Sequence, residues 1–480
     1  MPFIAEDIVR FTPDRGSPFS LYWGEEVEVL GNSGGRTQLR VLERGARPIP
    51  GSVAGRLPTQ DKRPLQFMMI DVQQGDGLMF LTPAGRKIFV DGGDNELFAR
   101  FAAARFRGSS AEQPLEVDAM VVTHGDADHF GGLSEIRDSE THRTLRKRLF
   151  IHPRRVFHNG IVKGPSTRDS KRVPDEELLG ATVPLPDGGL GIRELVDDPT
   201  ALPDSRLNVP FRRWKNSLLH WAGRGPIEFR RLARGDREAF EFLADEGIEV
   251  EVLGPGTRHA TVDGRRQSVL EFLREPPKDD SISVAGFDPA GRAYSASHTI
   301  NGHSITLRLR YGNVRFFLGG DLNQQAMATL NARYSKAQLQ SEILKIPHHG
   351  SADFDFRLLK SISPAISLIS SGDESSRTEY IHPRATLLGA LGRIARSDVS
   401  LVFSTELAAF FELRGWSKTN DGKRSYFGFE RTNFGIVHIR TDGERILVFT
   451  HSGKRGMNEA YRLDVDARGK VTMAKSIARR

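Results

Sequence analysis

The chain contains 480 residues, with 68 Lys and Arg against 61 Asp and Glu, a net charge of +7, and no cysteine. This length predicts two or three domains, while the lack of cysteine excludes disulfide bonds and leaves histidine, carboxylate and other oxygen groups as metal ligands. No apolar run is long enough to span a membrane, and the N-terminus lacks a basic segment followed by an apolar one, so we expect a cytoplasmic protein without a membrane partner.

Residues 21–57 contain short strand-like runs separated by a glycine-rich turn at 31–35. This pattern predicts a small β module, and it resembles a bacterial SH3-type barrel. The polar segment 57–64, which is bounded by prolines, is typical of a linker. We therefore predict that residues 1–62 form a small SH3-like β module and a linker.

The sequence pattern changes at Leu65, where apolar residues occupy both faces of the predicted strands. Such runs indicate a sheet covered on both faces, as in layered α/β folds. They occupy residues 67–72, 87–91, 117–123, 248–253, 305–309, 314–318 and 343–346. Residues 160–245 are first irregular and proline-containing and then helical, so we predict an insertion there. We assign residues 63–425 to one α/β domain, and residues 426–480 to a C-terminal β-rich extension that packs on this domain or continues it.

Two histidines and two aspartates follow the predicted strand at 117–123, in the loop His124-Gly125-Asp126-Ala127-Asp128-His129. A loop at the end of a strand holds such side chains on rigid backbone, so that they can converge on one point. Burying these charges side by side without a cation would be costly. The loop therefore predicts a metal site in preference to a purely structural cluster.

Further candidate ligands lie where two later strands end. Asp321 follows an apolar run and two glycines, and His348 and His349 follow the strand at 343–346. An aspartate at a strand end commonly caps the next helix, and a buried histidine is more often a hydrogen-bonded core residue than a ligand. Taken together with the 124–129 loop, these residues describe a single site.

The chain resembles the metallo-β-lactamase-fold hydrolases, and within them the ComEC-type competence hydrolase domain and its soluble relatives. The motifs that carry this resemblance occur in the family's order: Ile70 to Gly77, Val90 to Gly93, His124 to His129, Gly319 to Asp321, and Pro347 to Ser351. The resemblance implies an α/β fold, an αββα sandwich, with the metal ions at one edge.

The resemblance also implies a ligand set for two divalent metal ions, Zn²⁺ or Mn²⁺. This set comprises His124, Asp126 and a further histidine for one ion, Asp128, His129 and His349 for the other, and Asp321 as the bridge. His303 is the first candidate for the further histidine because of its distance along the chain from Asp321, and His298 is the second candidate. The alternative is that His303 is an ordinary turn histidine. Asp126 replaces a histidine found in most members, which shifts the metal preference toward harder ions such as Mn²⁺. The resemblance implies a supporting role for Asp91, His348 and Ser351.

His382, in the pair His382-Pro383, lies where ComEC-type sequences also have such a pair. A histidine there could contact the scissile phosphate or protonate a leaving group. A structural histidine at the start of a helix is the alternative. We expect Asp128, Asp321 and His382 to take part directly in catalysis.

These observations predict a hydrolase in which two ions share a hydroxide at neutral pH. The expected substrate is a phosphodiester such as nucleic acid, as in a nuclease, because the resemblance, the carboxylate-rich ligand set and the basic charge all favour one. Two other hypotheses stay open: hydrolysis of a small ester, cyclic nucleotide, thioester or lactam at the same site, and a non-catalytic, metal-stabilised binding protein that acts through the SH3-like module. The sequence specifies no protein partner.

Overall fold

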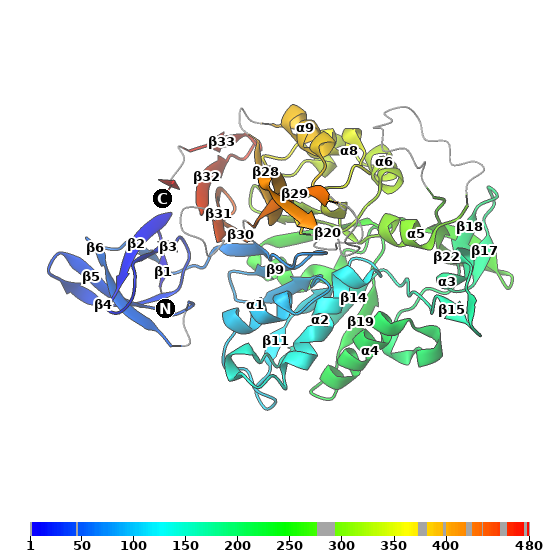
Figure 1. Cartoon of the computed structure of the whole chain (residues 1–480), viewed down its shortest axis with the longest axis horizontal. Coiled ribbons are helices and arrows are strands. Elements are labelled where there is room, and N and C mark those ends of the chain that lie inside the picture. Colours follow the sequence, from blue (N-terminus) through cyan, green and yellow to red (C-terminus); the bar gives the residue numbers. More distant parts are fainter. Residues whose placement is uncertain are drawn as a thin grey trace.

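The computed structural model describes residues 2–44, 47–275, 293–372, 382–396, 400–418, 425–433, 435–451, 458–474 and 478–479. In these ranges the chain forms a small N-terminal β module and a larger α/β body (Figure 1). None of the helices in these ranges is long and apolar enough to cross a membrane.

Five antiparallel strands form the N-terminal module. Their order is β3 (Phe19–Tyr22), β2 (Ile8–Pro13), β6 (Ile49–Ala54), β5 (Arg36–Val41) and β4 (Val27–Ser33). Alternating apolar residues of these strands share a buried core that includes Phe11, Leu21, Leu39 and Val53. The predicted small antiparallel β module is therefore present, and its likeness to an SH3 barrel stays a prediction.

The module packs against the C-terminal strands of the body. The Tyr22 ring stacks on Phe449 with 3.9 Å between ring centroids, and the fully buried Trp23 lies 3.9 Å below the Arg445 guanidinium. Arg440 is buried and donates to the backbone oxygen of Tyr22 at 3.1 Å. These contacts join the two ends of the chain.

Two sheets make up the centre of the body. The first runs in the order β19 (Glu228–Arg231), β14 (Arg155–His158), β12 (Ala119–Val121), β10 (Lys87–Val90), β9 (Leu78–Leu81), β8 (Leu65–Met69), β30 (Ile436–Thr441), β31 (Arg445–His451), β32 (Glu459–Val465) and β33 (Val471–Met473), with β34 (Ala478–Arg479) also on β32. The second runs in the order β20 (Ile248–Gly254), β23 (Thr306–Tyr311), β24 (Val314–Leu318), β25 (Ile343–Lys345), β26 (Ile366–Ile369) and β27 (Leu401–Ser404). Because β30 pairs with β8, the C-terminal strands continue the first sheet.

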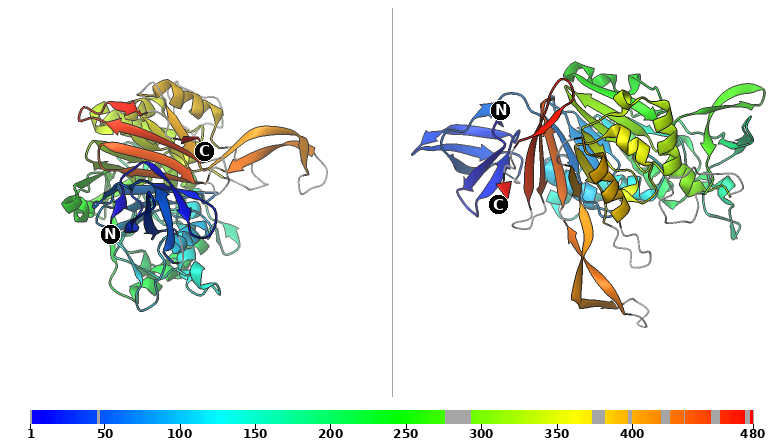
Figure 2. Two further views of the ribbon diagram at one scale, coloured as in Figure 1. Left: turned by 90° about the vertical axis from the view of Figure 1, so that its left-hand side faces the viewer. Right: turned by 90° about the horizontal axis from the view of Figure 1, so that it is seen from above.

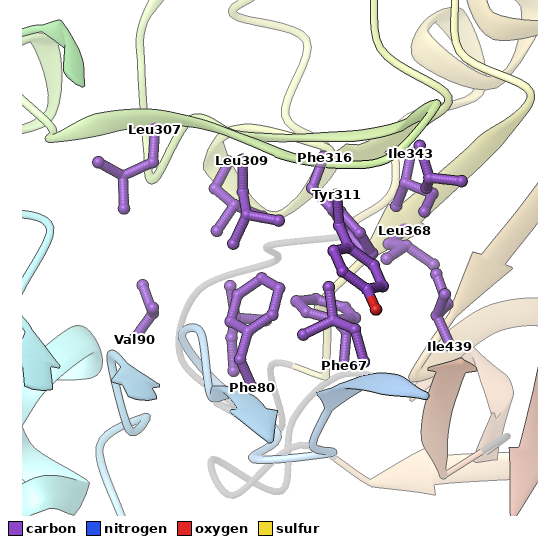
Figure 3. Close-up of a cluster of buried hydrophobic side chains, with 14 of the residues drawn as sticks. Phe67, Phe80, Val90, Leu307, Leu309, Tyr311, Phe316, Ile343, Leu368 and Ile439 are labelled. Atoms are coloured by element: carbon purple, nitrogen blue, oxygen red, sulfur yellow. The ribbon is translucent and has the colours of Figure 1, made fainter. Parts of the chain in front are cut away.

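The two sheets face each other across a large apolar core (Figure 3). Phe67, Phe80 and Val90 enter it from the first sheet, and Leu307 and Phe316 enter it from the second. The Phe80 and Phe316 rings meet edge to face with 5.6 Å between centroids. Strands that are apolar on both faces therefore pack against the opposite sheet with one face and against helices with the other.

Helices cover the outer faces of both sheets, which gives four layers (Figures 1 and 2). The first sheet is covered by α1 (Leu97–Arg105), α2 (Ala127–Ser139) and α4 (Val209–Ala222). The second is covered by α6 (Gln324–Arg333), α8 (Phe356–Ile362) and α9 (Ala385–Ile394). The body is thus a mixed α/β structure with helices outside and sheets inside.

The segment 160–245, predicted as an insertion, is divided between two places. Its later part supplies α4 and the edge strand β19 of the main fold. Its earlier part contributes β17 (Thr182–Pro184) and β18 (Leu190–Ile192) to a small separate sheet with β22 (Arg265–Phe272) and β21 (Arg258–Val262). A hairpin of β28 (Glu406–Lys418) and β29 (Ser425–Asn433) projects from the body (Figure 2).

Candidate metal centre

The predicted ligands lie where strands of both sheets end at a shared edge. The loop 122–126 follows β12 and leads into α2, whose N-cap is Asp126. In the second sheet, Asp321 follows β24 and His349 follows β25; these strands are parallel, so their ends lie together. A hydrogen bond of 2.8 Å from Ile305 N to Thr123 O links the two sheets at this edge.

Three histidines and two aspartates converge there. His129 Nε2 lies 3.3 Å from Asp321 Oδ2, and His349 Nε2 lies 3.0 Å from the same oxygen. His349 Nε2 is also 3.8 Å from Asp128 Oδ2, and the rings of His124 and His129 are 4.0 Å apart. The ligand atoms of His124, His129 and Asp321 lie within 4.8 Å of one another, as do those of Asp128, His129 and His349. The two groups share His129.

Neighbouring groups orient the two histidines of the 124–129 loop. Asp91 Oδ2 accepts from Thr123 Oγ1 at 2.6 Å and lies 2.9 Å from His129 Nδ1, so that Nδ1 carries the proton in the neutral ring. Because the Thr123 hydroxyl donates to Asp91, it accepts from His124 Nδ1 at 3.0 Å. Both rings therefore turn an Nε2 lone pair toward the cluster, as histidines that bind metals commonly do.

His349 is oriented in the same way by a different partner. Its Nδ1 lies 3.2 Å from the backbone oxygen of Ser370, so Nδ1 donates and Nε2 faces Asp321. Its backbone has φ of 53°, the left-handed region that non-glycine residues seldom adopt. Such backbone strain is typical of functional sites.

The buried donor set fits a cation. His124 Nε2 is buried without a hydrogen-bond partner among the described residues, whereas buried polar atoms are normally hydrogen-bonded. Imidazole nitrogens and carboxylate oxygens that lie close together are the ligands that Zn²⁺ and Mn²⁺ use. The residues present thus suit one or more divalent ions.

Charges within the cluster shift its pKa values. Although burial favours the neutral forms, the Asp321 carboxylate raises the pKa of His349 to about 10 and that of His129 well above its ordinary value. Those two histidines in turn outweigh burial and hold the pKa of Asp321 well below its usual range. Burial lowers the pKa of His124. The cluster therefore balances its carboxylate with imidazolium protons, which a metal ion would replace.

A polar cavity of about 250 Å³ adjoins the cluster. Its lining includes Gln73, Gln74, Asp126, Asp128, Ser297, Asn301, Asp321, His348, His349, Ser371 and His382. Burial, followed by the positive charge of His349, lowers the pKa of His382 to about 3. Burial thus favours the neutral ring of His382, which can hydrogen-bond to a molecule in the cavity.

His303 and His298 lie outside this cluster. His303 Nε2 is 2.6 Å from the backbone oxygen of Glu271, and the residue lines a different cavity of about 170 Å³. His298 Nδ1 is 3.3 Å from Asn323 Nδ2. Neither predicted histidine belongs to the close ligand groups found among the described residues.

Of the remaining predicted residues, Asp126 and His348 line the cavity without belonging to the close ligand groups, and Ser351 is not among the residues that line it. Asp126 Oδ1 is 3.6 Å from Lys163 Nζ. His348 Nε2 is 3.4 Å from Asn301 Nδ2, and Ser351 Oγ accepts from the backbone of Asp353 at 3.1 Å. His348 thus borders the cavity, whereas the observed contact of Ser351 is to its own loop.

Sequence reasoning assigned no role to four residues that the structure places at the site: Asp76, Lys163, Asn301 and Lys345. Two of them carried a signal in the sequence: Asp76 lies in the motif Ile70 to Gly77, and Lys345 is a charged residue inside the apolar run 343–346. Lys163 and Asn301 are placed by contacts between segments far apart in the chain.

Comparison with known proteins supports this assignment in part. Residues 78–196 match the model of the metallo-beta-lactamase superfamily, so this segment is similar to the domains of that superfamily. A search of curated proteins found no match. The matched segment includes the 124–129 loop and ends before Asp321 and His349, so it is the structure that connects those two residues with the loop.

Proposed function

We propose that this protein is a dinuclear metal-dependent hydrolase that cleaves phosphodiesters and acts on nucleic acid. The observation that carries the proposal is the convergence of His124, His129, His349 and Asp321, from loops of two different sheets, on one buried point beside a polar cavity. Metal-dependent hydrolysis agrees with the superfamily match. The phosphodiester substrate goes beyond that match and is part of the proposal.

In the proposed site, His124, Asp126, Asp128, His129, His349 and Asp321 would hold two Zn²⁺ or Mn²⁺ ions. His303 is left out of this set because it lines a different cavity, whereas Asp126 lines the cavity beside the cluster. When bound, the ions lower the pKa of a water molecule and neutralise charge on the phosphate. Asp321 would supply a carboxylate between the two loops, since histidines of both loops face its Oδ2.

The chain's own side chains account for the remaining chemistry. Asp91 fixes the ring of His129 through Nδ1. His382 and Asn301 border the cavity and can hydrogen-bond to phosphate oxygens. Lys163, whose ammonium lies 3.6 Å from Asp126 and is partly exposed, places a positive charge near the cavity, which favours an anionic substrate.

The direct test is a substrate screen with protein reloaded with Mn²⁺ or Zn²⁺. We expect cleavage of single- or double-stranded DNA or RNA, and a much slower reaction with lactams, thioesters and small phosphate esters. Activity confined to small esters would replace the phosphodiester proposal, and metal binding without any turnover would favour a binding protein.

A further inference from the structure

One ammonium group lies wholly inside the body, beneath the candidate metal centre. Lys345 ends β25 and is 0% exposed, although lysine is almost never fully buried unless it is paired. Its Nζ forms an ion pair with Asp76 Oδ2, donates to Gly320 O at 3.1 Å, and lies 3.8 Å from Asp321 Oδ1. Lys345 therefore touches the loop that carries the proposed bridging ligand.

Its partner Asp76 is equally buried and contacts two proposed ligands from behind. Asp76 Oδ1 lies 3.5 Å from His349 Nδ1, and Asp76 Oδ2 lies 4.0 Å from His129 Nδ1. The backbone oxygen of Asp76 accepts from Gly93 N at 2.7 Å, which fixes it to the first sheet. The pair of Asp76 and Lys345 thus connects the two sheets directly under the ligands.

The charges around the centre can be counted from these contacts. Five carboxylates lie in the cluster or against it: Asp76, Asp91, Asp126, Asp128 and Asp321. Lys345 supplies one buried positive charge. With neutral histidines, the carboxylates outnumber this one ammonium, and divalent ions would offset the remaining negative charge. Lys163 Nζ lies 3.6 Å from Asp126 Oδ1, and both side chains are partly exposed, at 29% and 23%, so solvent screens this pair more than the buried pair of Lys345 and Asp76.

We propose that Lys345 is a buried cation that neutralises Asp76 and so limits the negative charge of the metal centre, which tunes the affinity of the centre for divalent ions. The inference rests on the proposed function. Lys345 is a positioning residue, since it acts through Asp76 and Asp321 and does not line the cavity. If the pair sets the charge of the centre, replacing Asp76 and replacing Lys345 should change the metal affinity in opposite directions.

The test is a titration of metal-free protein with Mn²⁺, comparing D76N, K345M and the double variant. D76N leaves an unbalanced ammonium 3.8 Å from Asp321, and it should weaken Mn²⁺ binding by about tenfold or more, because charges interact strongly at this range in a protein interior. K345M leaves an unbalanced carboxylate and should strengthen binding by about tenfold. The double variant should bind within about threefold of the wild type.

A buried ion pair at the other end of the same strand supplies the control. Glu342 is 0% exposed and is paired with Arg315 and Arg396. E342Q should lower the melting temperature of the metal-free protein and leave Mn²⁺ affinity unchanged. If K345M does not fold, K345Q provides the same comparison.

Three results would overturn the inference. If both single variants weaken Mn²⁺ binding, the pair is only structural; if neither changes it, Lys345 does not set the charge. In both cases two-ion binding by the wild type would leave the proposed function standing. A wild-type protein that takes up no metal would remove the inference and the proposed function together.

Discussion

Asp321 is the residue on which the proposed site depends most, because its carboxylate faces His129 and His349 at once. Asp321→Asn keeps the size of the side chain and removes its charge. We expect loss of at least one ion and a fall in turnover of about a hundredfold or more. The fold should persist, since β24 and α6 on either side are packed independently through Phe316 and Met327.

His382→Ala is the contrasting variant. Because His382 borders the cavity and is absent from the close ligand groups, metal content should stay at the wild-type level. Turnover should fall about tenfold, the effect of losing one hydrogen bond to a charged group. Metal analysis and single-turnover assays of both variants check the pair of expectations. If His382→Ala lost metal, or Asp321→Asn kept metal and full activity, the assigned roles would be wrong.

His158 should make the stability of the protein depend on pH, beginning above the range in which most carboxylates titrate. Burial lowers its pKa to about 4, and its neutral ring lies 3.0 Å from Asp197 O and accepts from Gly160 N. The unfolded chain, with an ordinary histidine pKa of about 6.5, binds the proton first, so stability falls as pH drops from about 6.5 to about 4. The loss attributable to His158 is about 3 kcal/mol.

Denaturant unfolding of His158→Gln across this pH range measures the effect. The variant should lose less stability on acidification than the wild type, and a matched change at the exposed His259 should behave like the wild type. Identical pH profiles for wild type and His158→Gln would contradict this account.

At the scale of secondary-structure elements, the C-terminal strands are part of the main fold. β30 pairs with β8 over five residues from Val437↔Met69 to Thr441↔Leu65, and Ile439 and Val448 lie in the inter-sheet core. A chain that ends at residue 435 would expose the edge of β8 and this apolar face. We expect such a chain to be insoluble or molten in circular dichroism and gel filtration. A folded, monomeric truncated chain would show that residues 436–480 are an accessory extension.

Local patterns were sufficient to predict many elements, whereas pairings between distant segments were not. Runs apolar on both sides identified strands near 67–72, 87–91 and 343–346, since burial on both faces leaves a local signal. The pairing of β30 with β8, and the ion pair of Asp76 with Lys345, join residues that are far apart in the chain. Nothing in a single sequence encodes such contacts locally.

The candidate site shows the same limit. The loop 124–129 could be predicted because its charged residues are adjacent, and Asp321 and His349 because each follows a strand. His303 was chosen by its distance along the chain alone, and that spacing carries no information about the Glu271 oxygen that its ring contacts.

Salt dependence tests the proposed substrate at the scale of the whole molecule. The net charge of +7 and the ammonium of Lys163 near the cavity favour contacts with a phosphate backbone. Such contacts release counterions, so cleavage of nucleic acid should fall steeply between about 50 and about 200 mM salt at substrate concentrations below KM. Initial rates across this range provide the measurement. A flat response would point to a small neutral substrate.

The measurement that tests the central claim most directly is elemental analysis of the purified full chain. Two overlapping groups of ligand atoms, each within 4.8 Å, motivate it. We predict about two Zn²⁺ or Mn²⁺ ions per chain, with fewer in Asp321→Asn at equal protein concentration. A protein that contains no transition metal, and takes none up when titrated with Zn²⁺ or Mn²⁺, would contradict the account.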